Sequence, residues 1–476
     1  MTEQATRSAP PPTERVLSTL ESDGHRRWLR PKRAKGRFEN RRRLVAYVLI
    51  AMFTVTPFIK VDGTPLFQFD VANRRFTFFA TTFNADETLL LALLVLSIFI
   101  GIFLITALLG RVWCGWGCPQ TVYMEFLYRP IERLIDGRHY TSNGKAPLPA
   151  WRRLLKYAIF GVVSFHLANT FLAWFVGVDA MFEWTRQSPF EHPGPFGLVA
   201  VVTLLMMIDF CFFREQMCTL ACPYGRLQSV LLDRQSVIVG YDTQRGEPRG
   251  KRRKGADNEQ LGDCVDCKLC VRVCPTGIDI RDGLQLECIA CTQCIDACDD
   301  VMDKLGQDRG LIRYSSEAAL AGEPVKHLRP RVILYPLVLV VLLAAFGVAL
   351  MGRGTAELDI LRVRATPYEV LETGQVSSRV RFKLTNRSDV ARTYSLAVEA
   401  PGVEAIAPTL PATVAPNGAL EAVIFVIQPR ENFVDGGARI LLRLTDDQGE
   451  FLEREVRVTG PYGSAPSAAA GTGGDA

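Results

Sequence analysis

The stretch Cys264-Val-Asp-Cys267-Lys-Leu-Cys270-Val-Arg-Val-Cys274-Pro275 decides how the middle of this chain folds. Two residues separate each of the first three cysteines, and a fourth cysteine follows after three more residues, before a proline. The same spacing recurs at Cys288-Ile-Ala-Cys291-Thr-Gln-Cys294-Ile-Asp-Ala-Cys298, where Asp299 replaces the proline. In bacterial ferredoxins such a run wraps three corners of a cubane iron–sulfur cluster, and its fourth cysteine binds the other cluster.

The two runs together predict a dicluster ferredoxin domain of bacterial type at about residues 255–305, with two 4Fe-4S clusters. Zinc is the alternative metal, but zinc sites use pairs of Cys-x-x-Cys separated by a longer finger. Iron–sulfur chemistry and electron transfer are therefore favoured. We expect one cluster to be bound by Cys264, Cys267, Cys270 and Cys298, and the other by Cys288, Cys291, Cys294 and Cys274.

The distribution of cysteines and charges along the 476 residues narrows the class of protein. All 13 cysteines lie between Cys114 and Cys298, which is not the pattern of a disulfide scaffold. The formal net charge is +5, but the basic residues crowd beside apolar segments, so we expect a membrane and no nucleic acid as partner. No apolar segment precedes residue 44, and no cleavable signal peptide is expected.

Five apolar segments suggest membrane spans, since a bilayer core takes about 20 helical residues. The first is the weakest, because it is short and is broken near its end by Pro57. We expect an α-helical membrane protein with four helices and a cytoplasmic loop in residues 44–213 and a fifth helix at 331–351. The segments are Leu44–Ile59, Thr88–Leu109, Leu154–Val178, Phe196–Phe213 and Val332–Met351.

Basic residues predict the orientation of these spans. Ten Arg and Lys residues lie between Arg26 and Arg43 against the single acid Glu39, and the loop at 110–153 is also basic, whereas the loop at 179–195 is not. The positive-inside rule then places residues 1–43 and the cysteine-rich segment 214–330 in the cytoplasm of a cell with an inner membrane. Five spans place residues 352–461 in the periplasm.

The segment 352–461 shows short alternating runs separated by turn residues, which predicts an all-β immunoglobulin-like sandwich. The expected strands include Ser378–Thr385, Arg392–Glu399, Ala419–Ile427 and Arg439–Thr445. The ends of the chain, residues 1–23 and 462–476, have the composition of disordered segments.

Two further cysteine pairs, Cys114-Gly-Trp-Gly-Cys118-Pro119 and Cys218-Thr-Leu-Ala-Cys222-Pro223, each follow a predicted span. Thiols four residues apart share one face of a helix, so each pair is predicted to hold copper as Cu(I) or to relay electrons. The four cysteines are thus the candidate catalytic residues. The alternative is that they are small buried residues without chemistry; two copies at equivalent positions favour a function.

Other polar residues near the spans carry weaker predictions. His166 lies inside a span and is either functional or hydrogen-bonded to a neighbouring helix. Asp209 and Arg214 are expected to form an ion pair, Cys211 to be inert, and the run Arg249–Lys254 to face lipid headgroups.

Several longer strings show that the chain resembles the cytochrome c oxidase accessory protein family (CcoG, also FixG or RdxA), polyferredoxin-type membrane proteins, from about residue 40 to 460. The strings are Val112-Trp-Cys-Gly-Trp-Gly-Cys-Pro-Gln-Thr-Val-Tyr, Arg214-Glu-Gln-Met-Cys-Thr-Leu-Ala-Cys-Pro-Tyr-Gly-Arg, Tyr241-Asp-Thr-Gln-Arg-Gly-Glu-Pro-Arg, Cys274-Pro-Thr-Gly-Ile-Asp-Ile-Arg-Asp-Gly-Leu-Gln and Asp296-Ala-Cys-Asp-Asp-Val-Met-Asp-Lys.

The resemblance implies a role in assembling the cbb-type haem–copper oxidase, through reduction of Cu(II) to Cu(I) for delivery to that oxidase. It also implies five spans and an outer immunoglobulin-like domain. The expected partners are the membrane, copper ions, copper chaperones or oxidase assembly factors, an electron donor and a second copy of the chain.

Two other functions stay open on the sequence. A quinol dehydrogenase-like relay also combines membrane spans, two Cys-x-x-x-Cys-Pro motifs and two cubanes, but a four-span subunit of that kind lacks the fifth span and the outer β-domain. A non-catalytic assembly scaffold would keep the clusters as structural elements only.

Overall fold

A computed structural model describes residues 18–462 of the chain, except 21–24, 62, 72–74, 80, 85–87, 141–147, 252–259, 326–327, 353, 362–365, 389 and 400–401. Most residues of the two ends predicted to be disordered, and residues 252–254 of the basic run 249–254, lie outside the described residues. The chain forms two compact units, Met1–Gly347 and Val348–Ala476.

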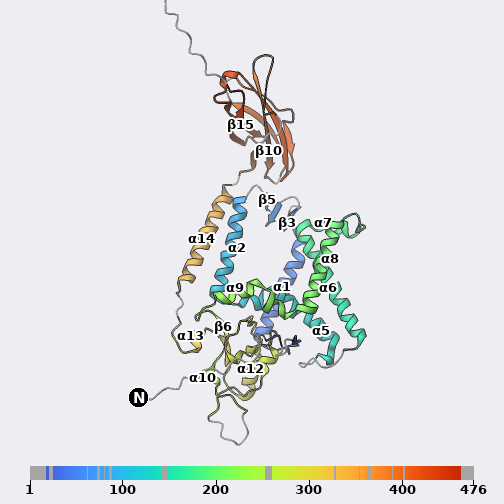
Figure 1. Cartoon of the computed structure of the whole chain (residues 1–476), viewed down its shortest axis with the longest axis vertical. Helices are drawn as coiled ribbons and strands as arrows, with labels where there is room; N and C mark the ends of the chain where they lie inside the picture. Colours follow the sequence, from blue (N-terminus) through green and yellow to red (C-terminus); the bar gives the residue numbers. More distant parts are fainter. Residues whose placement is uncertain are drawn as a thin grey trace, which may run out of the picture. The chain divides into compact units, whose positions relative to one another are not determined.

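The first unit is mainly helical (Figure 1). Short π-helical and 3-10 turns join several of its helices, namely η1 (Thr56–Phe58), η2 (Met124–Tyr128), η3 (Gly137–His139), η4 (Asp209–Phe213), η5 (Met217–Ala221) and η6 (Ile280–Asp282). Its helices are α1 (Arg37–Val55), α2 (Thr88–Leu109), α3 (Val112–Trp116), α4 (Pro119–Tyr123), α5 (Arg129–Asp136), α6 (Ala150–Val176), α7 (Val178–Thr185), α8 (Pro193–Ile208), α9 (Pro223–Leu231), α10 (Thr243–Gly246), α11 (Leu269–Val273), α12 (Gln293–Leu305), α13 (Glu317–Leu320) and α14 (Pro330–Met351).

Four helices of the described chain are long and apolar enough to cross a membrane: Leu89–Leu109, Ala150–Val176, Pro193–Phe213 and Pro330–Met351. Large apolar side chains stand exposed along them, as lipid-facing residues would. The predicted first span, Leu44–Ile59, is not among the four. It lies in the second half of α1 and in η1, and the charged first turns of α1, Arg37–Arg43, lower the hydropathy of that helix. The structure therefore leaves the fifth span as a prediction.

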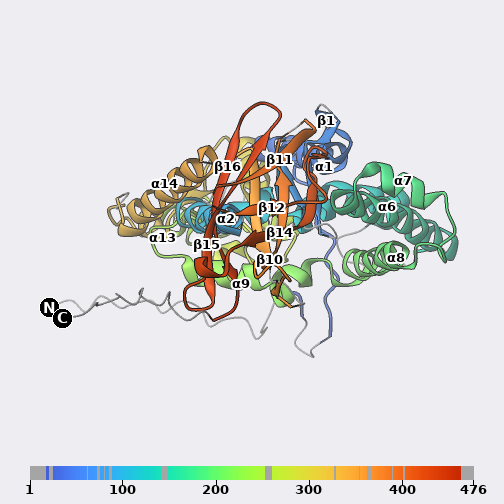
Figure 2. The ribbon, with the colours of Figure 1, turned by 90° about the horizontal axis from the view of Figure 1, so that it is seen from above.

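Contacts between the long helices define how they group (Figure 2). Helix α6 packs against α8, with Leu172 and Val199 in their shared core. Helix α2 meets α14 where the rings of Phe103 and Tyr335 lie 6.3 Å apart. Gly177 ends α6 in a conformation with φ of 83°, which favours glycine, so the chain turns into α7 one residue before the predicted end of that span.

The ferredoxin segment is wider than residues 255–305. Strand β6 (Ile238–Tyr241) pairs antiparallel with β7 (Ile312–Ser315) and so joins the two ends of a segment that contains both cysteine runs. Its buried core includes Val239, Ile280, Ile295 and Ile312. The cysteine spacing does not predict strands β6 and β7, because each is only four residues long and lies far from the cysteines that define the motif. Elsewhere in this unit, short antiparallel strands are β1 (Lys60–Val61), β2 (Thr64–Pro65), β3 (Phe67–Asp70), β4 (Arg75–Phe78) and β5 (Thr81–Asn84).

The second unit is a sandwich of two antiparallel sheets, which confirms the predicted immunoglobulin-like fold. One sheet has the order β12-β14-β10-β8, with β9 also paired to β10, and the other has the order β13-β11-β15-β16. All four expected strands are present, in β10, β11, β14 and β15. The bounds are β8 (Ala356–Leu361), β9 (Tyr368–Val370), β10 (Val376–Asn386), β11 (Arg392–Glu399), β12 (Glu404–Ile406), β13 (Ala412–Val414), β14 (Ala419–Gln428), β15 (Gly437–Asp446) and β16 (Phe451–Thr459).

The alternation along β14 gives a direct test of the sandwich. Ile424 is fully buried between the sheets, whereas its neighbour Val423 is 37% exposed. Ile424→Ala should destabilise the sandwich by about 2–5 kcal/mol, because it removes buried methyl groups and leaves a cavity. Hydrogen exchange of the full chain in detergent should show β10 and β14 losing protection in Ile424→Ala and little change in the control Val423→Ala; equal effects of the two would contradict the assigned faces.

Candidate iron–sulfur and thiol site

Two cavities divide the eight ferredoxin cysteines into the two predicted sets. One cavity is lined by Cys264, Cys267, Cys270 and Cys298. The other is lined by Cys274, Cys288, Cys291 and Cys294, and Cys270 reaches this cavity as well. The fourth cysteine of each run thus lies with the first three cysteines of the other run. This donor set of four converging thiols fits a cubane cluster in each cavity.

The backbone of each cysteine run explains how the thiols converge. Asp266 and Lys268 have positive φ angles of 49° and 54°, and the equivalent residues Ala290 and Thr292 have 52° and 62°. Residues with side chains rarely adopt this left-handed conformation, and it persists where the surroundings require it. Here the repeated left-handed residues curl each run into a tight loop, and a helix, α11 or α12, follows each loop.

Burial makes these thiols poor acids in the metal-free chain. It raises the pKa of Cys270, Cys291 and Cys298 to about 12 and that of Cys288 to about 11. A buried thiol becomes a thiolate when a metal replaces its proton, so metal binding here releases protons and stabilises the fold.

The two Cys-x-x-x-Cys-Pro pairs do not lie on single helices, so the predicted shared helix face is wrong. Cys114 lies in α3, but the chain is extended at Cys118, which precedes α4. Cys218 lies in η5, and the chain is extended again at Cys222, before α9. The proline after each second cysteine favours this extended conformation, because the helical region is disfavoured for a residue before proline.

The fold instead brings the four thiols together from two distant segments. Burial, and after it the neighbouring thiols Cys118, Cys114 and Cys222, raise the pKa of Cys218 to about 12. Cys114 is buried, packs in one apolar cluster with Cys218, Ile289 and Cys291, and donates a hydrogen bond from its thiol to Oε1 of Gln228 at 2.9 Å. We call Cys114, Cys118, Cys218 and Cys222 the four-thiol set.

The four-thiol set lies against the cavity that is lined by Cys274, Cys288, Cys291 and Cys294. We call this cavity the second ferredoxin cavity and its four cysteines the second ferredoxin set. At Gly115 an added Cβ would stand 2.6 Å from the carbonyl oxygen of Ile289 and 2.8 Å from the Cα of Cys291. The two backbones are therefore in direct contact, and only glycine permits this approach. Cys218 also lines a small cavity together with Thr276 and Ile289.

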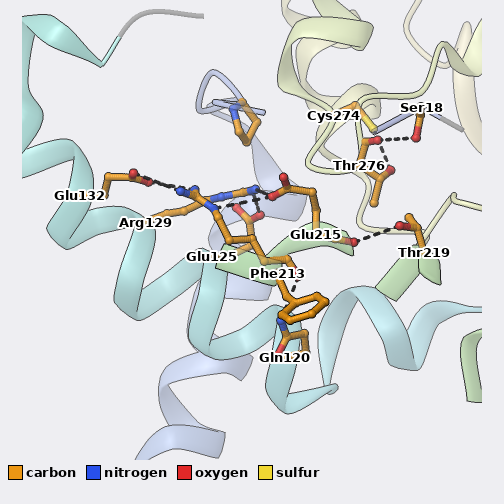
Figure 3. A network of polar contacts seen from close by, with 12 residues as sticks. Ser18, Gln120, Glu125, Arg129, Glu132, Phe213, Glu215, Thr219, Cys274 and Thr276 are labelled. Carbon is orange, nitrogen blue, oxygen red and sulfur yellow. Dashed lines mark hydrogen bonds and ion pairs between the residues drawn. The ribbon is translucent and has the colours of Figure 1, made fainter. Parts of the chain in front are cut away.

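A buried network of charged residues, which the sequence did not suggest, surrounds this junction (Figure 3). Arg129 binds Glu125 and Glu215, and Glu132 accepts hydrogen bonds from Arg214 at 2.9 and 3.1 Å. Burial alone would raise the pKa of Glu132, but Arg214 and other cations lower it to about 2. Lys156 adds contacts to Glu132 and Asp136. These charges compensate one another in a place where single charges would be costly.

The structure decides one of the weaker predictions and places the residues of two others. Arg214 pairs with Glu132 and not with Asp209, whose carboxylate accepts a hydrogen bond from Gln120 at 3.1 Å; the predicted ion pair is wrong because α5 brings Glu132 closer to the guanidinium. His166 stands exposed on α6. Cys211 is half-buried and lines a different cavity, with Arg214 and Lys156.

The fold and the site define a class: an iron–sulfur electron-transfer protein with helices of membrane-spanning length. Comparisons with known proteins agree. Residues 213–317 match a family model described as a 4Fe-4S dicluster domain, residues 91–138 match one described as a 4Fe-4S binding domain, and residues 346–461 match the IG-like fold at the C-terminus of FixG.

Curated relatives cover most of the chain. The nitrogen fixation protein FixG of Rhizobium meliloti is 35% identical over 79% of this chain and 79% of its own length. Protein RdxA of Cereibacter sphaeroides is 33% identical over 88% of this chain and 93% of its own length, and RdxB of that organism is 32% identical over 87% and 91%. The chain belongs to the FixG/RdxA family.

The crossed ligand sets can be tested with double variants. If Cys298 serves the same cluster as Cys264, then Cys298→Ser with Cys264→Ser should lose no more iron than either single variant, about four atoms per chain. Cys298→Ser with Cys291→Ser should lose about twice as much, because two clusters are affected. Iron and acid-labile sulfide of anaerobically purified chain measure this; the reverse order of losses would mean that each run binds its own cluster.

The backbone contact at Gly115 makes a second prediction. Gly115→Ala should loosen the loop of Ile289–Cys291, since the new methyl group meets backbone atoms that cannot move away cheaply. Iron bound by the second ferredoxin set should then be removed faster by a chelator. Gly101→Ala is the matched control, because nothing lies within 4 Å of its added Cβ. Equal rates in the two variants would show that the contact does not support the cluster loop.

Proposed function

We propose that this protein reduces Cu(II) to Cu(I) and thereby supports copper delivery to, and assembly of, a cbb-type haem–copper cytochrome c oxidase. The observation that carries the proposal is the placement of the four-thiol set against the second ferredoxin cavity, where Cys114 shares an apolar cluster with Cys291 and Gly115 meets the Cys291 backbone. Soft thiolates select Cu(I), so a redox-active thiol site beside an electron store suits this reaction. The family resemblance supports the same substrate.

Electrons would pass from the first ferredoxin cavity to the second and then to the four-thiol set. Cubane clusters, when bound, supply electrons one at a time. Cys270 lines both ferredoxin cavities, and Cys114 shares an apolar cluster with Cys291, so we propose that electrons pass from the first cavity to the four-thiol set by this route. We propose that Cu(II) accepts one electron there and leaves as Cu(I). Burial of the thiols keeps water away from the path.

We further propose that the protein is a multi-pass inner-membrane protein with its N-terminus and cysteine-rich segments in the cytoplasm and the sandwich in the periplasm. The basic residues before α1 and in the loop at 110–153 support this orientation. The exposed apolar residues Leu44, Val48 and Met52 on α1 support a fifth span in addition to the four apolar helices. A periplasmic sandwich would be free to contact oxidase subunits or assembly factors.

One observation favours a second candidate function, the quinol-linked relay. A cavity of about 310 Å³ is lined by the aromatic rings of Trp28, Tyr157 and Phe160 and by the polar ends of Lys156 and Arg214. Its aromatic and polar lining suits a quinol ring. In that case quinol would supply electrons, and copper reduction would be absent.

Copper reduction by the full chain decides between these functions. The protein is purified anaerobically in detergent, reduced with dithionite and freed of excess reductant, and Cu(II) is then added. We expect the absorbance near 420 nm to recover as one Cu(I) forms per electron. Replacing the four-thiol set by alanine should slow this reaction by more than about tenfold while the spectroscopic signature of the ferredoxin pair persists.

The matched control is Cys211→Ala, which removes a thiol of the same unit outside the set and should reduce copper normally. Clusters that ignore Cu(II) but are reduced by quinol would support the relay. Clusters that react with neither would leave a structural role in a scaffold and would refute the reductase.

A further inference from the structure

The second cysteine of each Cys-x-x-x-Cys-Pro pair has the backbone conformation of a ferredoxin ligand. Cys118 has φ and ψ of −63° and 127°, Cys222 has −71° and 110°, and Cys274, a predicted cluster ligand, has −68° and 121°. A proline follows each of the three. The Cys-Pro unit that presents a thiolate to the second ferredoxin cavity is thus built twice more in this chain.

The two pairs are also built alike. The amide of Cys118 donates to the carbonyl of Trp113 at 2.9 Å, and the amide of Cys222 donates to the carbonyl of Met217 at 2.8 Å, in each case five residues back. Each loop therefore presents one cysteine within the turn and one at its end. Two equal loops that converge from distant segments supply four thiols to one place.

An unpaired buried cation marks this place as a site for an anion. Arg111 is 6% exposed and donates to the backbone carbonyls of Gly225, at 3.0 Å, and Leu286. Its Nε has no hydrogen-bond partner, and no carboxylate in the described part of the chain pairs with it. Leaving a guanidinium buried and unpaired is costly. Arg111 touches both loops of the four-thiol set: its own carbonyl accepts from the amide of Cys114 at 3.1 Å, and Gly225 lies three residues after Cys222.

The four-thiol set resembles the ferredoxin cysteines in its donors and in their placement. Among the described residues no group of three or more His, Cys, Asp and Glu side chains is placed to hold one metal ion. The eight ferredoxin cysteines share this property, since each thiolate of a cubane binds a different iron. The 4Fe-4S binding model matched by residues 91–138 covers only Cys114 and Cys118, and a cubane needs two more ligands. Cys218 and Cys222 would supply them.

We propose that Cys114, Cys118, Cys218 and Cys222 together bind a third 4Fe-4S cluster, beside the cluster of the second ferredoxin set. Four thiolates on a cubane carry net negative charge, which the guanidinium of Arg111 would balance. The third cluster would exchange single electrons with the second ferredoxin cluster across the apolar cluster that Cys114 forms with Ile289 and Cys291. The inference rests on the proposed function only for the electron acceptor: the third cluster would pass the electron to Cu(II), and the four thiolates would bind iron instead of binding copper directly.

Iron content tests the third cluster independently of activity. The full chain is purified anaerobically and reconstituted with iron and sulfide. Bound iron and acid-labile sulfide are then measured and divided by the amount of protein, which amino-acid analysis gives. We expect about 12 irons in the wild type and about 8 after Ser replaces all four cysteines of the set. Cys211→Ser is the matched control and should keep about 12. Reduced wild-type protein should also show a paramagnetic cluster signal that is lost in the fourfold variant.

Each outcome has one meaning. About 8 irons in the wild type, with copper bound after copper addition, would overturn the third cluster in favour of direct copper ligation. The same iron count without copper would show the thiols to be inert. Should the fourfold variant fail to fold, the wild-type count still decides. A chain with the full iron count that leaves Cu(II) unreduced would keep the third cluster and refute only the copper reductase.

Discussion

The arrangement of this site depends on the backbone contact between Gly115 and the loop Ile289–Cys291. That contact fixes the end of α2 and α3 against the ferredoxin segment. Two side chains hold it from the N-terminal side. Fully buried Arg42 donates to the carbonyl of Gly115 at 3.0 Å, and Asp296, from α12, accepts hydrogen bonds from the amides of Phe38 and Glu39 and so caps α1. Helices α1, α3 and α12 are thereby joined at one point.

The buried charges around this junction follow from the same constraint. Polar helix ends meet a cysteine-rich segment whose clusters would add negative charge. Buried arginines lie at this junction, and Arg129 and Arg214 each form ion pairs with defined glutamates. Removing one member of such a buried pair typically costs about 3–5 kcal/mol, because the other charge is left uncompensated. The network therefore fixes the orientation of α5 and η5, and with it the position of Cys218.

Metal binding and folding are coupled in this design. Most of the cluster-facing thiols are buried or half-buried, and burial raises the pKa values of Cys270, Cys288, Cys291 and Cys298 well above neutrality. The metal-free chain thus holds neutral thiols in preformed cavities, and cluster insertion exchanges their protons for iron. The sandwich, with its own apolar core around Phe382, Ile424 and Leu442, needs no metal to bury its hydrophobic residues.

The sequence alone determined the features that depend on local spacing: the two cysteine runs, the long apolar helices, the alternating strands of the sandwich and the family. These follow from chain periodicity and from ligand geometry within a few residues. The tertiary structure decided what depends on distant segments. It placed Cys114 and Cys118 with Cys218 and Cys222, paired Arg214 with Glu132 instead of Asp209, and left Arg111 buried without a carboxylate partner among the residues that the structure describes. No local pattern encodes such contacts, because each arises from the packing of elements about 100 residues apart, as Cys114 and Gln228 show with a separation of 114.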